Sequence, residues 1–155
     1  MKFLKLTVCC ALFAFAITSC KKETENNVSK NDLIVMNGAQ VAPPNQSAAS
    51  AQLGVVYESR TKVLNYLIVW SGLTADASAI HVHGPADRGF AGPVIQTITM
   101  TDAMKKRAGS YSGNLFIDGV KLTEAELLAG KYYVDIHTTG TFATSGEVRG
   151  QIEFK

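Results

Sequence analysis

Residues 32–155 form a succession of short β-prone runs separated by turn residues, and this pattern constrains the fold more than any other feature. Runs rich in Val, Ile, Leu and Tyr lie at residues 33–36, 51–58, 62–70, 79–83, 94–100, 110–117, 131–137 and 147–154. Pro43-Pro44-Asn45 and a Gly/Pro-rich stretch at 84–93 interrupt them. About eight short strands at near-regular spacing are typical of an antiparallel sandwich or barrel.

One short helix is expected between the sixth and seventh strands. Thr123 and Glu126 have the spacing of a capping box, in which each side chain bonds to the other residue's backbone N–H. Leu127 and Leu128 supply an apolar side, and Gly130 is suited to end the helix. With nothing repeating at a fixed period, the length of 32–155 predicts one domain with a single core.

Residues 1–19 have the features of a signal peptide. Lys2 and Lys5 precede an apolar run at 6–17 that is too short to span a bilayer as a helix. The run ends in Ile17-Thr18-Ser19-Cys20, which resembles a bacterial lipobox, so Cys20 is the expected lipidation site. The alternative is an ordinary secretory signal with an incidental cysteine.

Residues 20–31 are polar, which predicts a flexible tether between a lipid anchor and the domain at 32–155. The residue directly after Cys20 is not an aspartate. By resemblance to bacterial lipoproteins, this favours the outer membrane, on its periplasmic or surface face. The membrane, reached through the lipid, is thus one expected partner.

Composition excludes two classes of function. The three cysteines are Cys9, Cys10 and Cys20, so the domain contains no disulfide and no thiol catalyst. The full chain has 15 basic and 13 acidic residues, and loss of Lys2 and Lys5 with the leader leaves 13 of each. No basic stripe remains for nucleic acid.

The histidines are the main candidates for chemistry. His81 and His83 share one face of a strand, and His137 shares a face with Asp135 on another. Convergence of the three imidazoles would form a mononuclear copper or zinc site with an open position, with Asp135 or Glu147 orienting an imidazole from behind. Alternatively, the histidines are structural hydrogen-bonding residues beside a Glu147–Arg149 pair.

Several segments in a fixed order resemble the CHRD domain, a family named for its occurrence in chordin and found in many bacterial secreted proteins. They cover nearly the whole folded part: residues 33–43, 71–73, 80–86, 92–94, 128–134, 136–138 and 146–151. The resemblance implies an immunoglobulin-like or superoxide-dismutase-like β-sandwich, in a family of unsettled biochemical role. His81-Val82-His83 also looks like the paired copper ligands of copper-zinc superoxide dismutases, although three histidines are too few for a dinuclear site.

Two functions follow from the sequence. The favoured one is a non-enzymatic, membrane-anchored binding module of the bacterial cell envelope, with an envelope protein or glycan as partner and no catalytic residues. The alternative is a copper or zinc binding protein that uses His81, His83 and His137.

Overall fold

The computed structural model describes residues 27–155, so the expected signal peptide, Cys20 and most of the expected tether lie outside the described part. The described chain forms eight strands, one 3-10 helix and one α-helix. In chain order they are β1 (Val28–Asn37), η1 (Gly38–Gln40), β2 (Ser50–Glu58), β3 (Val63–Ser71), β4 (Ala77–His83), β5 (Val94–Ile98), β6 (Gly109–Phe116), α1 (Glu124–Leu128), β7 (Tyr133–Thr138) and β8 (Val148–Gln151).

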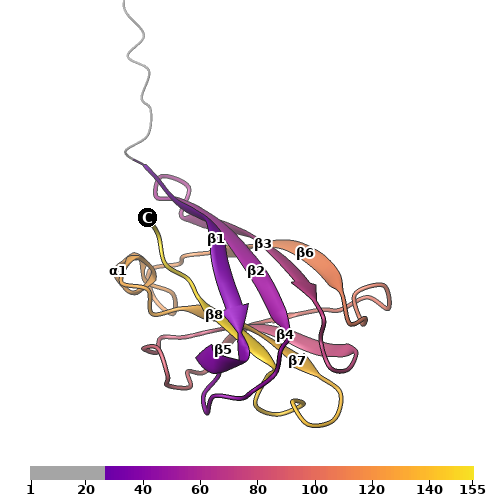
Figure 1. Cartoon of the computed structure of the whole chain (residues 1–155). Coiled ribbons are helices and arrows are strands. Elements are labelled where there is room, and N and C mark those ends of the chain that lie inside the picture. The colour runs from indigo at the N-terminus through magenta and orange to yellow at the C-terminus, as the bar shows by residue number, and fades with distance from the viewer. Residues whose placement is uncertain (1–26) are drawn as a thin grey trace, which may run out of the picture.

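The strands form one antiparallel sheet in the order β5-β4-β7-β8-β1-β2-β3-β6. Asn37 and Arg149 are the one pair that joins β1 to β8, so the sheet divides there into two four-stranded halves. The halves curl over each other around a common interior (Figure 1). The predicted all-β antiparallel fold with about eight strands and one short helix is confirmed.

Both halves contribute alternate side chains to a single apolar core. On β3, every second residue from Leu64 to Trp70 is at most 4% exposed, while the residues between them face outward. Ile80 and Val82 of β4 and Val134 and Ile136 of β7 meet them from the other half. Trp70, at 1% exposed, is a core residue.

The domain begins earlier than the sequence indicated. β1 starts at Val28, so the part of the predicted tether at 28–31 is strand. Asn31 is buried, and its side chain donates to the carbonyl of Glu153. Polar composition concealed this part of β1, because residues 28–31 pair with the backbone of β2 without adding an apolar residue to the core.

The helix begins as the capping-box spacing predicted. Thr123 is the N-cap, and its hydroxyl accepts from the backbone N–H of Glu126 at 3.2 Å while donating to the Glu126 carboxylate at 2.8 Å. The last two strands are shorter than expected and begin at Tyr133 and Val148. None of the helices between residues 27 and 155 has the length and apolar character needed to cross a membrane.

Candidate metal centre

The candidate centre lies on the face of β4 and β7 that points away from the apolar core. His81 pairs with Asp135 across the two strands, and Ala79 pairs with His137. Alternation therefore sends Ile80 into the core while the imidazoles and the carboxylate gather on the opposite face. On this face Asp135 and His137 are 5% and 6% exposed, so the cluster is enclosed.

The loop after β4 fixes the orientation of His83. Gly84 has φ 145°, and a Cβ there would lie 2.2 Å from the ring of Tyr132. Glycine at this position lets the chain turn back, so that the carbonyl of Gly92 accepts from Nδ1 of His83 at 2.9 Å. A carbonyl can only accept a hydrogen bond, so Nδ1 carries the proton and an uncharged His83 presents a lone pair at Nε2.

His137 is fixed in the same way by the loop between β7 and β8. Its Nδ1 donates to the carbonyl of Ala143 at 3.1 Å, which leaves Nε2 directed into the cluster. Backbone carbonyls behind metal-binding histidines orient the ring in this manner. Asp135, predicted to orient an imidazole, contacts the Nε2 atoms of His83 and His137 rather than their Nδ1 atoms.

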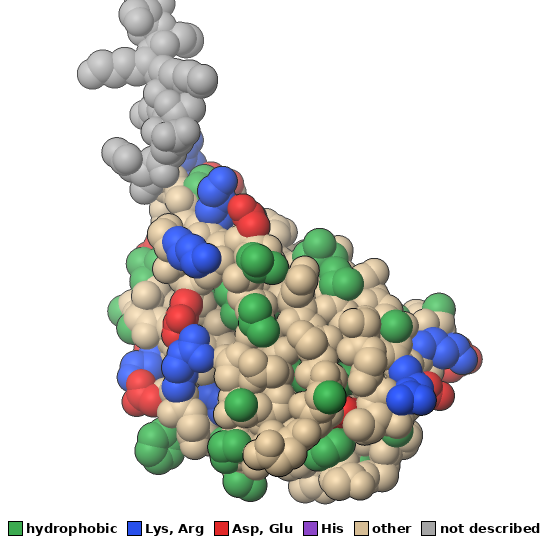
Figure 2. Space-filling model, viewed as in Figure 1, with side chains coloured by type: hydrophobic (Ala, Val, Ile, Leu, Met, Phe, Trp, Pro, Cys, Tyr) green, Lys and Arg blue, Asp and Glu red, His purple; other side chains and the backbone are tan. Residues whose placement is uncertain are grey.

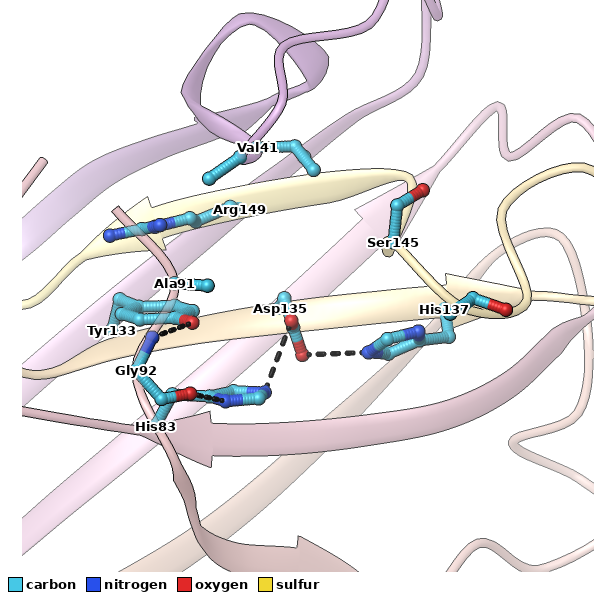
Figure 3. Close-up of a pocket in the computed structure, with 11 residues that line it drawn as sticks. Val41, His83, Ala91, Gly92, Tyr133, Asp135, His137, Ser145 and Arg149 are labelled. Atoms are coloured by element: carbon cyan, nitrogen blue, oxygen red, sulfur yellow. Dashed lines mark hydrogen bonds and ion pairs between the residues drawn. The ribbon is translucent and has the colours of Figure 1, made fainter. Parts of the chain in front are cut away.

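Four polar atoms converge between the strands. His81 Nδ1 lies 3.1 Å from His137 Nε2, His137 Nε2 lies 3.2 Å from Asp135 Oδ1, and His83 Nε2 lies 3.1 Å from Asp135 Oδ2. One ligand atom from each of the four residues lies within 4.8 Å of all the others. Figure 3 shows the His83 and His137 rings on either side of the Asp135 carboxylate.

These separations match a small coordination sphere. Ligands about 2.0–2.1 Å from a tetrahedral zinc ion are about 3.3–3.4 Å from one another. The closest contacts in the cluster, including 3.7 Å from His81 Nδ1 to Asp135 Oδ1, bracket this value, and all four ligand atoms lie within 4.8 Å of one another. In such a sphere three imidazoles and one carboxylate would fill all four positions, and Asp135 would take the position that three histidines alone leave open.

The close contacts leave two atoms of the cluster without a hydrogen-bond partner. His83 Nε2 and Asp135 Oδ1 are buried and have no partner in hydrogen-bond geometry. Buried polar atoms without a partner are rare in folded proteins, and they call for a proton, a water or an ion between them. Here the unpartnered atoms are a nitrogen lone pair and a carboxylate oxygen, both of which bind cations.

Burial and mutual contacts shift the pKa values of three residues of the cluster. Burial by itself would raise the pKa of Asp135, but the contacts with His137 and His83 outweigh it and hold the pKa below its usual value. Burial opposes protonation of His137, yet Asp135 raises its pKa overall. Burial lowers the pKa of His81, against the pull of Asp135 and with the help of the two other imidazoles. The carboxylate is thus held ionised.

A stack of rings covers the His83 side of the centre. The His83 ring lies parallel to the ring of Tyr133, with 4.7 Å between centroids. The guanidinium of Arg149 lies 3.4 Å from the centre of the Tyr133 ring and donates to the carbonyls of Phe90 and Asp87. Arg149 therefore ties the 84–93 loop to β8 and holds the wall against which His83 packs.

Glu147 does not belong to the centre. Its fully buried carboxylate accepts from the hydroxyls of Ser47 and Thr138 and from the backbone N–H of Thr74, at 2.6–2.9 Å. The predicted Glu147–Arg149 pair is wrong because β8 begins only at Val148, so strand alternation does not extend back to residue 147. Its carboxylate instead joins the end of β7 to the two loops that contain Ser47 and Thr74.

A small pocket of about 120 Å³ opens onto the cluster from one side. His83, Asp135 and His137 are among the residues that line it, together with Thr144 and Ser145. His81 approaches from elsewhere, and its side chain is 20% exposed. The cluster is therefore reachable by a small solute although three of its four members are buried.

Comparison with known proteins agrees with this architecture. The family model described as "CHRD domain" matches residues 33–152. The chain belongs to the CHRD domain family. This membership indicates an extracellular binding or interaction module. Searches of curated proteins and of solved structures each found no match.

Strand alternation predicted that Asp135 and His137 share a face, and the structure adds His81 and His83 to them. Sequence reasoning missed Asp135 as a ligand candidate, because the β4–β7 register that places it opposite His81 has no signature in either strand alone. It also missed the carbonyls of Gly92 and Ala143, which any residue type supplies.

Proposed function

We propose that this CHRD domain is a non-enzymatic binding module of the cell envelope whose ligand is a single transition-metal ion. His81 Nδ1, His83 Nε2, His137 Nε2 and one carboxylate oxygen of Asp135 are the proposed ligands. The observation that supports this most is the orientation of His83 and His137. Both imidazoles are fixed by backbone carbonyls so that lone pairs face an ionised carboxylate. Such an arrangement is repulsive without a cation or added protons.

Zinc fits the donor set best. Three imidazoles and a carboxylate with near-tetrahedral separations are typical of Zn²⁺, whereas Cu²⁺ prefers a square-planar arrangement. Copper stays in the proposal as the competing ion, because imidazole binds it tightly. A four-ligand site without an open position favours metal storage, metal transfer or stabilisation of the fold over catalysis.

We further propose that the protein is a lipoprotein, acylated at Cys20 and held at the outer membrane of a bacterium. The sequence of residues 1–20 supports this proposal, which would place the metal centre outside the cytoplasm. An additional envelope protein or glycan partner stays a prediction.

Metal analysis of the purified domain tests the function. Residues 21–155, which omit Cys20, are dialysed against zinc and then against metal-free buffer, and bound metal is measured by mass spectrometry. We expect one zinc per chain, and none in a His83→Ala variant. Glu147→Gln is the matched control, because its buried carboxyl group lies outside the centre, so this variant keeps the metal. A wild-type domain without stoichiometric metal would overturn the proposal.

A further inference from the structure

One row of paired residues defines the end of the molecule at which the described chain begins. Val28 pairs with Glu58, Glu58 with Val63, and Val63 with Phe116, across β1, β2, β3 and β6. We call this row, with the turn at 59–62 and the loop at 117–123, the Val28 end. The C-terminus also lies here, beside the start of β1 (Figure 1).

A second row contains the candidate metal centre and lies at the opposite end of β1. Asn37 pairs with Arg149, Arg149 with Asp135, and Asp135 with His81. β1 runs from Val28 to Asn37, and at about 3.3 Å per residue this separates the two rows by about 30 Å. The Val28 end and the metal centre therefore face opposite directions along the strands.

The Val28 end exposes apolar side chains that contribute little to the core. Val120 is 84% exposed, Phe116 60% and Val28 46%. Val120 is presented by a fixed loop, because Asp118 Oδ1 accepts from the backbone N–H groups of residues 120, 121 and 122 at 2.8–3.0 Å. Its exposure is thus built into the loop conformation.

The charges at this end are compatible with a lipid surface. Glu124 accepts from Lys62 and Tyr57, and the Asp118 carboxylate is occupied by backbone N–H groups. Lys121 is exposed beside Val120. Figure 2 shows blue side chains, with red ones among them, around the point where the described chain begins, and green side chains nearby. Apolar side chains next to basic ones are the composition that binds at a bilayer interface.

We propose that the Val28 end is a phospholipid-contacting surface, with Val120 and Phe116 at the headgroup boundary and the metal centre turned away from the membrane. This inference rests on the proposed acylation of Cys20. Eight residue steps from Cys20 to Val28 span at most about 28 Å when fully extended. The anchor therefore keeps this end of the domain close to the bilayer.

A fluorescence experiment on the acylated mature protein, which begins at Cys20, tests the orientation. The domain contains no cysteine of its own, so Val120→Cys and Phe90→Cys each introduce a single thiol for an environment-sensitive dye. Phe90 is the matched control: it is 69% exposed, and its carbonyl accepts from Arg149 near the metal centre. Both proteins are reconstituted in vesicles of phosphatidylethanolamine and phosphatidylglycerol that contain a lipid-borne quencher.

We expect the dye at position 120 to be quenched at least twofold more than the dye at position 90, with an emission shift to shorter wavelength. Equal quenching at the two positions in vesicle-bound protein would overturn the orientation while leaving the anchor intact. Protein that does not float with the vesicles would instead overturn the anchor, and the orientation with it.

Discussion

Replacing His81 separates the metal function of the cluster from its structural role. His81 is the most exposed of the four proposed ligands, so His81→Gln should change the stability of the metal-free domain by less than about 1 kcal/mol. The same change removes one of four metal ligands. A purely structural cluster would therefore respond only weakly to this variant, whereas a metal centre would lose most of its affinity.

The size of the effect follows from linkage. Zinc at about 100 times its dissociation constant stabilises the folded state by about 2.7 kcal/mol. A domain of about 125 residues unfolds with an entropy of about 0.26 kcal/mol per kelvin, so this corresponds to an increase in Tm of about 10 °C. We expect this shift in the wild type and less than about 3 °C in His81→Gln at the same zinc concentration.

Differential scanning calorimetry with and without zinc measures both quantities. The reasoning would be refuted if His81→Gln kept the full zinc-induced shift, because His81 Nδ1 would then not be a ligand. It would also be refuted if the wild type showed no shift, because zinc would then not bind the folded domain.

Three further predictions follow from the structure. Glu147→Gln should cost about 1–3 kcal/mol in denaturant unfolding, because the amide cannot accept from all three buried donors, while the zinc-induced Tm shift persists. Gly84→Ala should cost about 1–3 kcal/mol, since its Cβ would overlap the Tyr132 ring, and zinc titration should show weaker binding as the loop that orients His83 shifts. Because the pKa of His137 is raised above 6.5 and that of Asp135 lowered below 3.8, stability of the metal-free domain should decline as pH rises through the folded pKa of His137 and as it falls through that of Asp135. Zinc should reverse the decline at higher pH, because protons compete with zinc for its ligands. Chemical denaturation across pH measures both declines. A metal-free domain that gains stability above neutral pH would contradict the assignment.

The strand pattern in the sequence predicted much of the fold. The succession of β-prone runs predicted the all-β antiparallel fold, and the capping box at Thr123 predicted a helix start that the structure contains. The start of β1 was missed because residues 28–31 are mostly polar and pair with β2 through the backbone without adding an apolar residue to the core. Local patterns specify which face a residue occupies, but not which strand lies beside it.

The same limit explains why the sequence predicted only part of the candidate metal centre. Alternation grouped His81 with His83 and Asp135 with His137, yet only the pairing of β4 with β7 brings the two groups within 4.8 Å. Glu147 resembled a member of that face because alternation was extended through it. In the structure, Gly146 has φ 79° just before it, and this turn redirects the Glu147 carboxylate toward Ser47 and Thr138.

Anomalous diffraction at the zinc absorption edge, from crystals of the zinc-loaded domain, tests the central claim most directly. We expect a single strong peak about 2.0–2.2 Å from His81 Nδ1, His83 Nε2, His137 Nε2 and one Asp135 oxygen, with the Nδ1–H groups of His83 and His137 still on the carbonyls of Gly92 and Ala143. A peak elsewhere, or no peak between β4 and β7, would contradict the assignment of this CHRD domain as a metal-binding module.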